Sequence, residues 1–248
     1  MPNFWNVVND VIQEADVLLL LLDARLVNET RNLEIEKRVK NNRKPLIYVI
    51  TKSDLVDRKE NEKFRKEINP CVLVSAKKHL GKTRLRQQIL IEAKRKGIEK
   101  DQVTVGVLGY PNVGKSSLIN AMKGRRAAST SIMSGHTKGM QMIKGDNRIM
   151  FLDTPGVIPF REKDWVKHTL IGTIDFTKSK DPDLVVMRLM EKFPGMVESY
   201  YKVKKNEDLE EVIEEIARKK NILKKGGVPD MKRMAREILK DWQKGEIR

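Results

Sequence analysis

The stretch VTVGVLGYPNVGKSS, residues 103–117, decides the fold of this chain. An apolar run ends at Gly109, and Gly114, Lys115 and Ser116 complete the spacing G-x-x-x-x-G-K-S. Glycine at both positions lets the backbone turn tightly and approach a phosphate, so that successive N–H groups and the start of the next helix face the anion. The stretch therefore predicts a strand, a phosphate-binding P-loop and a helix.

The side chains and N–H groups of this loop form the first part of a predicted nucleotide site. Lys115 reaches the outer phosphates, and the Ser116 hydroxyl binds a Mg²⁺ ion. A chance match is the alternative, but few chance matches lie between an apolar run and a plausible helix. The predicted nucleotide-binding residues of this loop are Asn112, Val113, Gly114, Lys115, Ser116 and Ser117.

The length and charge of the chain bound its organisation. With 248 residues it has room for a nucleotide-binding domain of about 150 residues and a smaller companion, which we place at residues 1–165 and 166–248. The net charge of +16 indicates a polyanionic partner, either nucleic acid or an acidic membrane. Only 5% of residues are aromatic, which favours contact with phosphate backbones over stacking on single strands. A heat-adapted surface would explain the 34% charged residues but not their imbalance.

We expect neither a membrane span nor a leader in this sequence. The longest aliphatic run, 17–22, is far too short to cross a bilayer, and the first residues lack a basic segment followed by an apolar one. The single cysteine, Cys71, has no partner for an intrachain disulfide. We therefore expect a cytoplasmic protein that does not bind a membrane.

A base-recognition motif follows the apolar run 46–50, which is typical of a buried strand. Asp54 can accept two hydrogen bonds from the N1–H and N2–H₂ groups of guanine, a pair that adenine does not offer, while the stem of Lys52 lies along the base. An exposed lysine and aspartate at a strand end are more often simply solvated, so the motif is weak by itself. It reads Thr51-Lys52-Ser53-Asp54.

A second strand end carries residues of the same kind. The expected strand 71–74 leads into Ser75, Ala76 and Lys77, and this S-A-K sequence places a backbone N–H against guanine O6 in GTP-binding domains. The carboxyl ends of two strands therefore point to one base.

Two segments after the P-loop are candidates for sensing Mg²⁺ and the γ-phosphate. Residues 125–139 are rich in Ser, Thr and Gly, which predicts a loop, and Thr137 is the candidate switch threonine. The expected strand 149–152 leads into a D-x-x-G motif, in which Asp153 holds Mg²⁺ through water and the Gly156 N–H bonds the γ-phosphate. The predicted catalytic residues are Lys115, Thr137 and Gly156, and the predicted Mg²⁺ ligands are Ser116, Thr137 and Asp153.

Together these motifs resemble the signatures of translation-factor-related GTPases in permuted order. The T-K-S-D and S-A-K motifs precede the P-loop, as in the circularly permuted GTPases of the YlqF/YawG type, whose known members assist ribosomal subunit assembly. The D-A-R at 23–25 and the G-Y-P-N-V-G-K-S at 109–116 support the resemblance. It implies an α/β fold with a mostly parallel sheet, GTP as substrate, Mg²⁺ as cofactor, and a K⁺ site at Asn112.

The chain also departs from the pattern of that family. The Pro-Gly-His-Met sequence that bacterial members often carry near the start is absent, and His136 precedes Thr137 where Gly-Thr-Thr is usual. Val157 stands where many GTPases have the Gln that orients the attacking water. We therefore expect slow intrinsic hydrolysis that a ribosomal partner and K⁺ stimulate.

The last third of the chain is helical and strongly charged. Apolar residues recur at helical spacing over 209–217 and 231–242, which predicts a small all-α domain. Residues 218–236 contain eight Lys or Arg and one acid, a net charge of +7, around a K-G-G turn that resembles the turn of the family's RNA-binding domain. A solvated basic face is the alternative, and residues 77–96 form a second basic segment. The predicted RNA-binding residues are Lys219, Lys220, Lys224 and Lys225.

The sequence as a whole predicts a monomeric GTPase that contacts rRNA or a pre-ribosomal particle, with the large subunit as the expected target. Two alternatives stay open. One is a GTP-gated RNA-binding module with negligible turnover, and the other is a GTPase in a different RNA-linked task such as tRNA modification.

Overall fold

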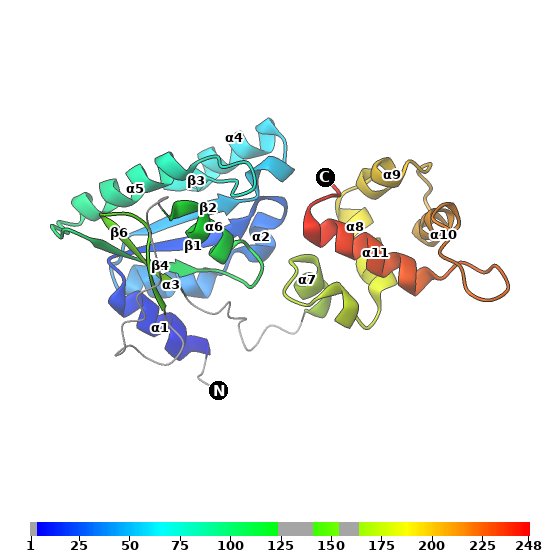
Figure 1. The fold of residues 1–248 in the computed structure, drawn as a ribbon, viewed down its shortest axis with the longest axis horizontal. Helices are drawn as coiled ribbons and strands as arrows, with labels where there is room; N and C mark the ends of the chain where they lie inside the picture. Colours follow the sequence, from blue (N-terminus) through cyan, green and yellow to red (C-terminus); the bar gives the residue numbers. More distant parts are fainter. Residues whose placement is uncertain (1–3, 124–140, 154–163) are drawn as a thin grey trace. The chain divides into compact units, whose positions relative to one another are not determined.

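A computed structural model describes residues 4–123, 141–153 and 164–248 (Figure 1). The chain divides into two compact units, residues 1–162 and 163–248, each of which is considered by itself below. The sequence placed a domain boundary at 165/166. The predicted residues Thr137 and Gly156 lie outside the described ranges. None of the described helices is long and apolar enough to span a membrane.

The first unit is built on a six-stranded sheet with the order β3-β2-β1-β4-β6-β5. Neighbouring strands are parallel, except that the edge strand β5 is antiparallel to β6. The predicted mostly parallel α/β fold is confirmed. The strands are β1 (Val17–Asp23), β2 (Leu46–Thr51), β3 (Cys71–Leu73), β4 (Val103–Leu108), β5 (Gln141–Lys144) and β6 (Ile149–Asp153).

Helices connect the parallel strands and cover the sheet (Figure 1). Because successive strand residues point to opposite faces, β1 contributes to the core on both sides. The helices are α1 (Phe4–Glu14), α2 (Val27–Thr30), α3 (Leu33–Asn41), α4 (Arg58–Glu67), α5 (Lys82–Arg95) and α6 (Lys115–Met122), with short 3₁₀ helices η1 (Ala24–Leu26) and η2 (Ser53–Leu55).

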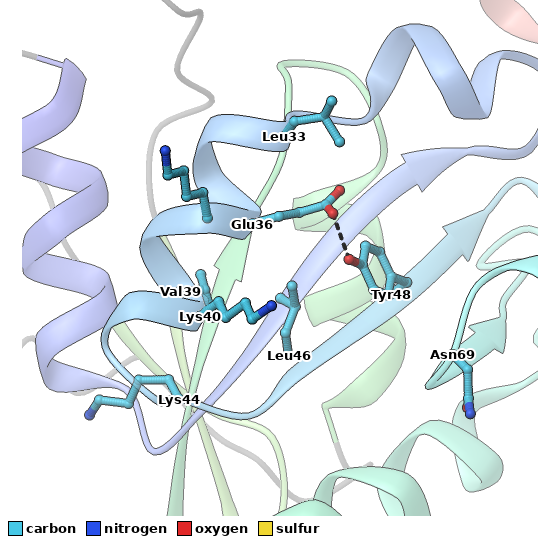
Figure 2. A pocket seen from close by; sticks show the side chains of 9 residues that line it. Leu33, Glu36, Val39, Lys40, Lys44, Leu46, Tyr48 and Asn69 are labelled. Carbon is cyan, nitrogen blue, oxygen red and sulfur yellow. Dashed lines mark hydrogen bonds between the residues drawn. The ribbon is translucent and has the colours of Figure 1, made fainter.

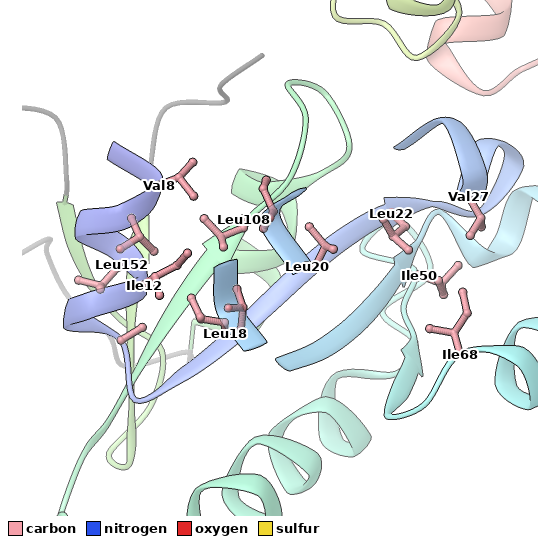
Figure 3. Packing of buried hydrophobic residues seen from close by; sticks show 14 of the residues in the cluster. Val8, Ile12, Leu18, Leu20, Leu22, Val27, Ile50, Ile68, Leu108 and Leu152 are labelled. Carbon is pink, nitrogen blue, oxygen red and sulfur yellow. The ribbon is translucent and has the colours of Figure 1, made fainter. Parts of the chain in front are cut away.

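Strand β1 is the centre of the core, and each of its residues is buried. Leu18, Leu20 and Leu22 pack in one cluster with Val8 and Ile12 of α1 (Figure 3). Burying a leucine side chain contributes roughly 1.5–3 kcal/mol, so this strand anchors the unit. Its apolar run explains why the sheet forms around it, with β2 and β4 as its neighbours.

The carboxyl ends of the parallel strands meet at one edge of the sheet. Asp23 at the end of β1 pairs with Thr51 at the end of β2, and Leu20 of β1 pairs with Leu108 at the end of β4. The fifth parallel strand, β6, ends at Asp153. Parallel sheets place ligands at this edge, so the fold brings the separated motifs of the sequence together.

The second unit is a helical bundle, and its helices over 209–217 and 231–242 confirm the predicted ones. Trp242 is fully buried, donates from Nε1 to the Leu170 carbonyl at 2.8 Å, and packs against Phe193 with ring centroids 5.4 Å apart. The helices are α7 (Trp165–Leu170), η3 (Phe176–Lys178), α8 (Pro182–Lys192), α9 (Met196–Tyr201), α10 (Leu209–Lys219) and α11 (Met231–Lys244).

Candidate functional site

The loop between β4 and α6 has the backbone that the P-loop pattern predicts. Gly109 and Gly114 have φ values of 147° and 103°, and Asn112 has a φ of 62°. A Cβ atom at Gly109 would stand 2.9 Å from the Leu21 carbonyl oxygen, so a larger residue would push the loop away from β1. Gly114 directly precedes α6, which leaves the first N–H groups of that helix available to an anion.

Lys115 is the buried cation of this loop. Its ammonium donates to the Gly109 and Tyr110 carbonyl oxygens, at 2.9 and 2.7 Å. Burial lowers the pKa of Lys115 to about 8, although the nearby charge of Asp153 raises it. A nucleotide phosphate would give this ammonium a stronger partner than the two carbonyl groups do.

Ser116 and Asp153 supply the oxygen donors that Mg²⁺ prefers. Ser116 is exposed in the first turn of α6, and Asp153 ends β6 close enough to Lys115 for their charges to interact. A hydroxyl and a carboxylate at one site suit Mg²⁺, which binds few protein ligands and keeps water and phosphate oxygens around it. Ser116 and Asp153 could hold the implied ion, which would neutralise phosphate charge when bound.

Thr51, the first residue of T-K-S-D, ties the base-recognition motif to the P-loop. Its hydroxyl lies 2.6 Å from the Val113 carbonyl oxygen and 3.0 Å from the Leu22 carbonyl oxygen. The hydroxyl has a single proton, so it donates to one carbonyl oxygen at a time. Thr51 therefore stabilises the contact between the two halves of the predicted site.

The ends of β2 and β3 are also joined. The Ser53 N–H donates to the Val74 carbonyl at 3.2 Å, which places the 3₁₀ turn that carries Asp54 beside the start of S-A-K. Asp54 is half-buried there. Buried Ser75 accepts at its hydroxyl from the Lys78 N–H at 3.0 Å and so closes the turn that presents Ala76 and Lys77.

Lys52 belongs to a charged cluster that the sequence motifs did not predict. Its ammonium lies 2.6 Å from Oδ2 of Asp23, and the Arg25 guanidinium binds both oxygens of the same carboxylate, at 3.1 and 3.0 Å. From the sequence, D-A-R is only a sign of the family resemblance. An acid at the end of a fully apolar strand, directly beside the T-K-S-D strand, is the signal that could have found this contact.

A groove of about 580 Å³ lies elsewhere, between α3 and the amino-terminal half of β2 (Figure 2). Tyr48 donates to Glu36 there at 2.8 Å, and Arg31 also binds Glu36. Since the predicted motifs follow the carboxyl ends of the strands, this groove is not part of the candidate site. Its lining residues are Leu33, Glu36, Lys37, Val39, Lys40, Lys44, Leu46, Tyr48 and Asn69.

The four predicted RNA-binding lysines of the second unit have different surroundings. Lys219 donates to the Lys202 carbonyl at 2.7 Å, and the Lys220 ammonium lies 5.5 Å from the centre of the Tyr201 ring. Lys224 and Lys225 are exposed on a hairpin. The Lys224 N–H donates to the Val228 carbonyl at 2.8 Å and closes that hairpin.

The fold and this edge of the sheet define a class of protein. The P-loop, the T-K-S-D motif predicted to recognise guanine and the carboxylate predicted to bind Mg²⁺ follow the carboxyl ends of strands in one sheet, and the strands of the base motif precede the P-loop strand in the chain. The first unit thus has the fold of a P-loop GTPase domain, with its motifs in circularly permuted order.

Comparisons with known proteins place it more closely. The model of a family described as 50S ribosome-binding GTPase matches residues 104–225. A GTP-binding protein of Methanocaldococcus jannaschii is 39% identical over 97% of this chain and 65% of its own length. Nucleolar GTP-binding protein 2 of Saccharomyces cerevisiae is 32% identical over 98% of this chain and 52% of its own. The chain thus spans less than two thirds of each of these relatives.

Solved structures show the same fold. GNP-bound YlqF from T. maritima aligns with a TM-score of 0.66 and 22% identity, over 98% of this chain and 94% of that one. The GDP-bound form aligns with a TM-score of 0.65 and 24% identity. In the order of its motifs and in its fold the chain resembles the circularly permuted GTPases of the YlqF/YawG type, as the sequence predicted.

Proposed function

We propose that this chain binds GTP with Mg²⁺, hydrolyses it to GDP and phosphate, and acts in ribosome assembly by contacting rRNA or a pre-ribosomal particle. The observation that carries the proposal is the meeting of β1, β2, β3, β4 and β6 at one edge, where T-K-S-D, S-A-K and the P-loop are linked by hydrogen bonds. A cytoplasmic location and a monomeric state are parts of the same proposal.

The two ends of the nucleotide have separate partners in this proposal. Asp54 accepts from the guanine base, and the turn at Ser75, Ala76 and Lys77 presents an N–H group to guanine O6. The P-loop residues Asn112, Val113, Gly114, Lys115, Ser116 and Ser117 bind the phosphates. Thr51 supports both, because its hydroxyl contacts the P-loop carbonyl of Val113 while its backbone begins the base motif.

The target of the protein follows from its relatives and its charge. The names 50S ribosome-binding GTPase and nucleolar GTP-binding protein 2 support a role at the ribosome, with the large subunit as the proposed target. The exposed lysines at 224 and 225, together with 219 and 220, supply cations for an RNA phosphate backbone.

The proposal is tested by measuring GTP turnover with and without purified ribosomal subunits. We expect slow hydrolysis by the protein alone and a clear increase with the large subunit. The Lys115→Ala variant is the matched control, because it removes the phosphate-binding ammonium and should abolish turnover in both conditions. Binding to subunits without turnover would favour a GTP-gated RNA-binding module. Co-purification with tRNA in place of rRNA would favour a different RNA-linked task.

A further inference from the structure

We propose that Asp23 is a positioning residue for guanine-nucleotide binding, which holds the ammonium of Lys52 so that the stem of this lysine lies ready beside the base. The inference rests on the proposed function, since it concerns the same base pocket. It gives the D-A-R sequence at the end of β1 a physical role at that pocket. Asp23 does not touch the nucleotide in this proposal and acts through Lys52.

The contact geometry supports this role. Lys52 has a left-handed backbone, with a φ of 53°, and its ammonium turns back across the sheet edge to Oδ2 of Asp23 at 2.6 Å. The contact joins the last residue of β1 to the residue that follows β2. A lysine side chain has many rotamers in water, so an ion pair that selects one of them reduces the entropy lost on binding.

The carboxylate is itself fixed from several sides. Arg25 binds both of its oxygens through the guanidinium, and the Arg25 N–H donates to Oδ1 at 3.0 Å. The Asp23 N–H donates to the Thr30 hydroxyl at 3.1 Å, which anchors the backbone at the same residue. Asp23 is fully buried, and the side chain of Lys52 is 25% exposed. The buried acid is therefore the rigid partner, and the partly exposed lysine is the one that a ligand can meet.

The pKa shifts of Asp23 and Lys52 agree with a rigid buried acid that holds a partly exposed lysine. Burial raises the pKa of Asp23, but the charges of Arg25 and Lys52 more than offset it and lower the pKa to about 2. The pKa of Lys52 is lowered, because the effect of burial exceeds the opposing effect of the Asp23 charge. Two cations for one carboxylate leave a net positive charge beside the T-K-S-D turn. That excess is suited to a site whose ligand is an anion and whose neighbour Asp54 is acidic.

A double-mutant cycle on GDP affinity tests whether Asp23 acts through Lys52. The variants are Asp23→Asn, Lys52→Met and their combination, each titrated with a fluorescent GDP analogue. We expect about tenfold weaker binding for each single variant, and no further loss in the double variant, because removing Lys52 removes the group that Asp23 positions. Effects that multiply in the double variant would overturn the inference.

Two controls separate positioning from general damage to the fold. Asp16→Asn removes the carboxylate just before the same strand, where Asp16 pairs with Lys100 at 2.7 Å, and should leave GDP affinity unchanged. Inorganic triphosphate, which has no base, should compete equally well for the parent and for Asp23→Asn. If Asp23→Asn does not fold, Asp23→Glu keeps the charge while displacing the oxygens, and it should weaken GDP binding with Lys52 present but not in the Lys52→Met background.

The outcomes also distinguish this inference from the proposed function. A parent protein that binds no guanine nucleotide would overturn both. A parent that binds GDP, with unchanged affinity in a folded Asp23→Asn or Asp23→Glu variant, would overturn the inference alone. Equal losses of GDP and triphosphate binding would show that Asp23 supports the whole site, which also contradicts a role through Lys52.

Discussion

The lysines at the sheet edge of the first unit and those on the hairpin of the second have opposite surroundings. At the sheet edge of the first unit, Lys52 and Lys115 are held by a carboxylate and by two backbone carbonyls, at distances of 2.6–2.9 Å. On the hairpin of the second unit, Lys224 and Lys225 are exposed, and no acid pairs with them among the residues that the structure describes. A cation that its partners hold in one position suits a small ligand bound in one orientation. An exposed lysine can contact the phosphates of a long polyanion in many arrangements.

The Gly-Gly turn sharpens this difference. Gly226 and Gly227 have φ values of 87° and 78°, and nothing lies within 4 Å of a Cβ built on either. The glycines are therefore needed for backbone conformation and not for close packing. Val228 beside them is 58% exposed, which is unusual for a valine and leaves the hairpin tip without a covering element in the described part of the chain.

The largest expected effect is on RNA binding. Changing Lys219, Lys220, Lys224 and Lys225 to Glu reverses four charges, and we expect affinity for duplex RNA to fall by about a hundredfold or more at low salt, with a shallower salt dependence. Filter binding across a salt series measures both quantities. GTP affinity should be unchanged, and circular dichroism should show an intact fold.

A charge-matched variant on the first unit tests where the RNA surface lies. Lys78, Arg84, Lys94 and Lys96 are exposed on the second basic segment, and changing them to Glu alters the net charge equally. A smaller loss for this variant would support the hairpin. If the two losses are equal, binding follows total charge, and the contrast between the units disappears for RNA.

The second largest effect is on guanine selectivity. Asp54→Asn replaces a charged acceptor with an amide, and we expect the affinity for GTP to fall by about ten- to a hundredfold, or roughly 1.5–3 kcal/mol. Competition of GTP and ATP for a fluorescent nucleotide measures this change. The variant should bind ATP as weakly as the parent does, and equal binding of ATP and GTP by the parent would refute base recognition by Asp54.

Much of the fold and site could be predicted from the sequence, because its strongest signals are local. The run at 46–50 and the P-loop spacing predicted a strand and a phosphate loop, and both are present. Helical periodicity likewise located α10 and α11. These features depend on neighbouring residues, which a sequence displays directly.

The contacts between distant residues could not be predicted in the same way. The Asp23–Lys52 pair joins residues 29 positions apart, and the bond from Thr51 to Val113 spans 62 positions. Both depend on strand order, which places β1 between β2 and β4. The antiparallel edge strand β5 was also not anticipated, since the four residues of this strand carry a weak pattern.

The third prediction concerns the acid stability of the held cluster. The pKa of Asp23 is lowered from 3.8 to about 2 in the folded protein, so its ionised form stabilises the fold above pH 4. This contribution, roughly 2 kcal/mol, should be lost as the pH falls from 4 towards 2. Asn does not titrate, so the difference in unfolding free energy between the parent and Asp23→Asn should shrink over that range.

Urea unfolding of both proteins at several pH values between 2 and 6 measures this difference. The pH dependence that other carboxylates contribute is common to both proteins and cancels in the comparison. A difference that stays constant over the whole range would mean that Asp23 does not titrate differently in the folded and unfolded states. The cluster would then be no more tightly held than an exposed ion pair.

The smallest expected effect is that of potassium on turnover. Asn112 has a left-handed backbone in the P-loop, and in the resemblance to permuted GTPases it is the K⁺-binding position. A bound K⁺ would be a further held cation at the sheet edge, next to the charge that develops between the phosphates. We expect hydrolysis to be roughly tenfold faster in K⁺ than in Na⁺ at equal ionic strength.

The matched variant for this last test is Asn112→Asp, which keeps the size of the side chain and tolerates the left-handed backbone. It should alter the ratio of turnover in K⁺ to that in Na⁺ while leaving GDP binding in Na⁺ measurable. A general salt effect would change both proteins equally, because screening does not depend on the identity of the cation. Fast hydrolysis by the isolated protein that does not depend on the cation would contradict both the K⁺ site and the expected need for outside stimulation. K⁺ would then not join the cations held at the sheet edge, which are the side chains of Lys52, Lys115 and Arg25.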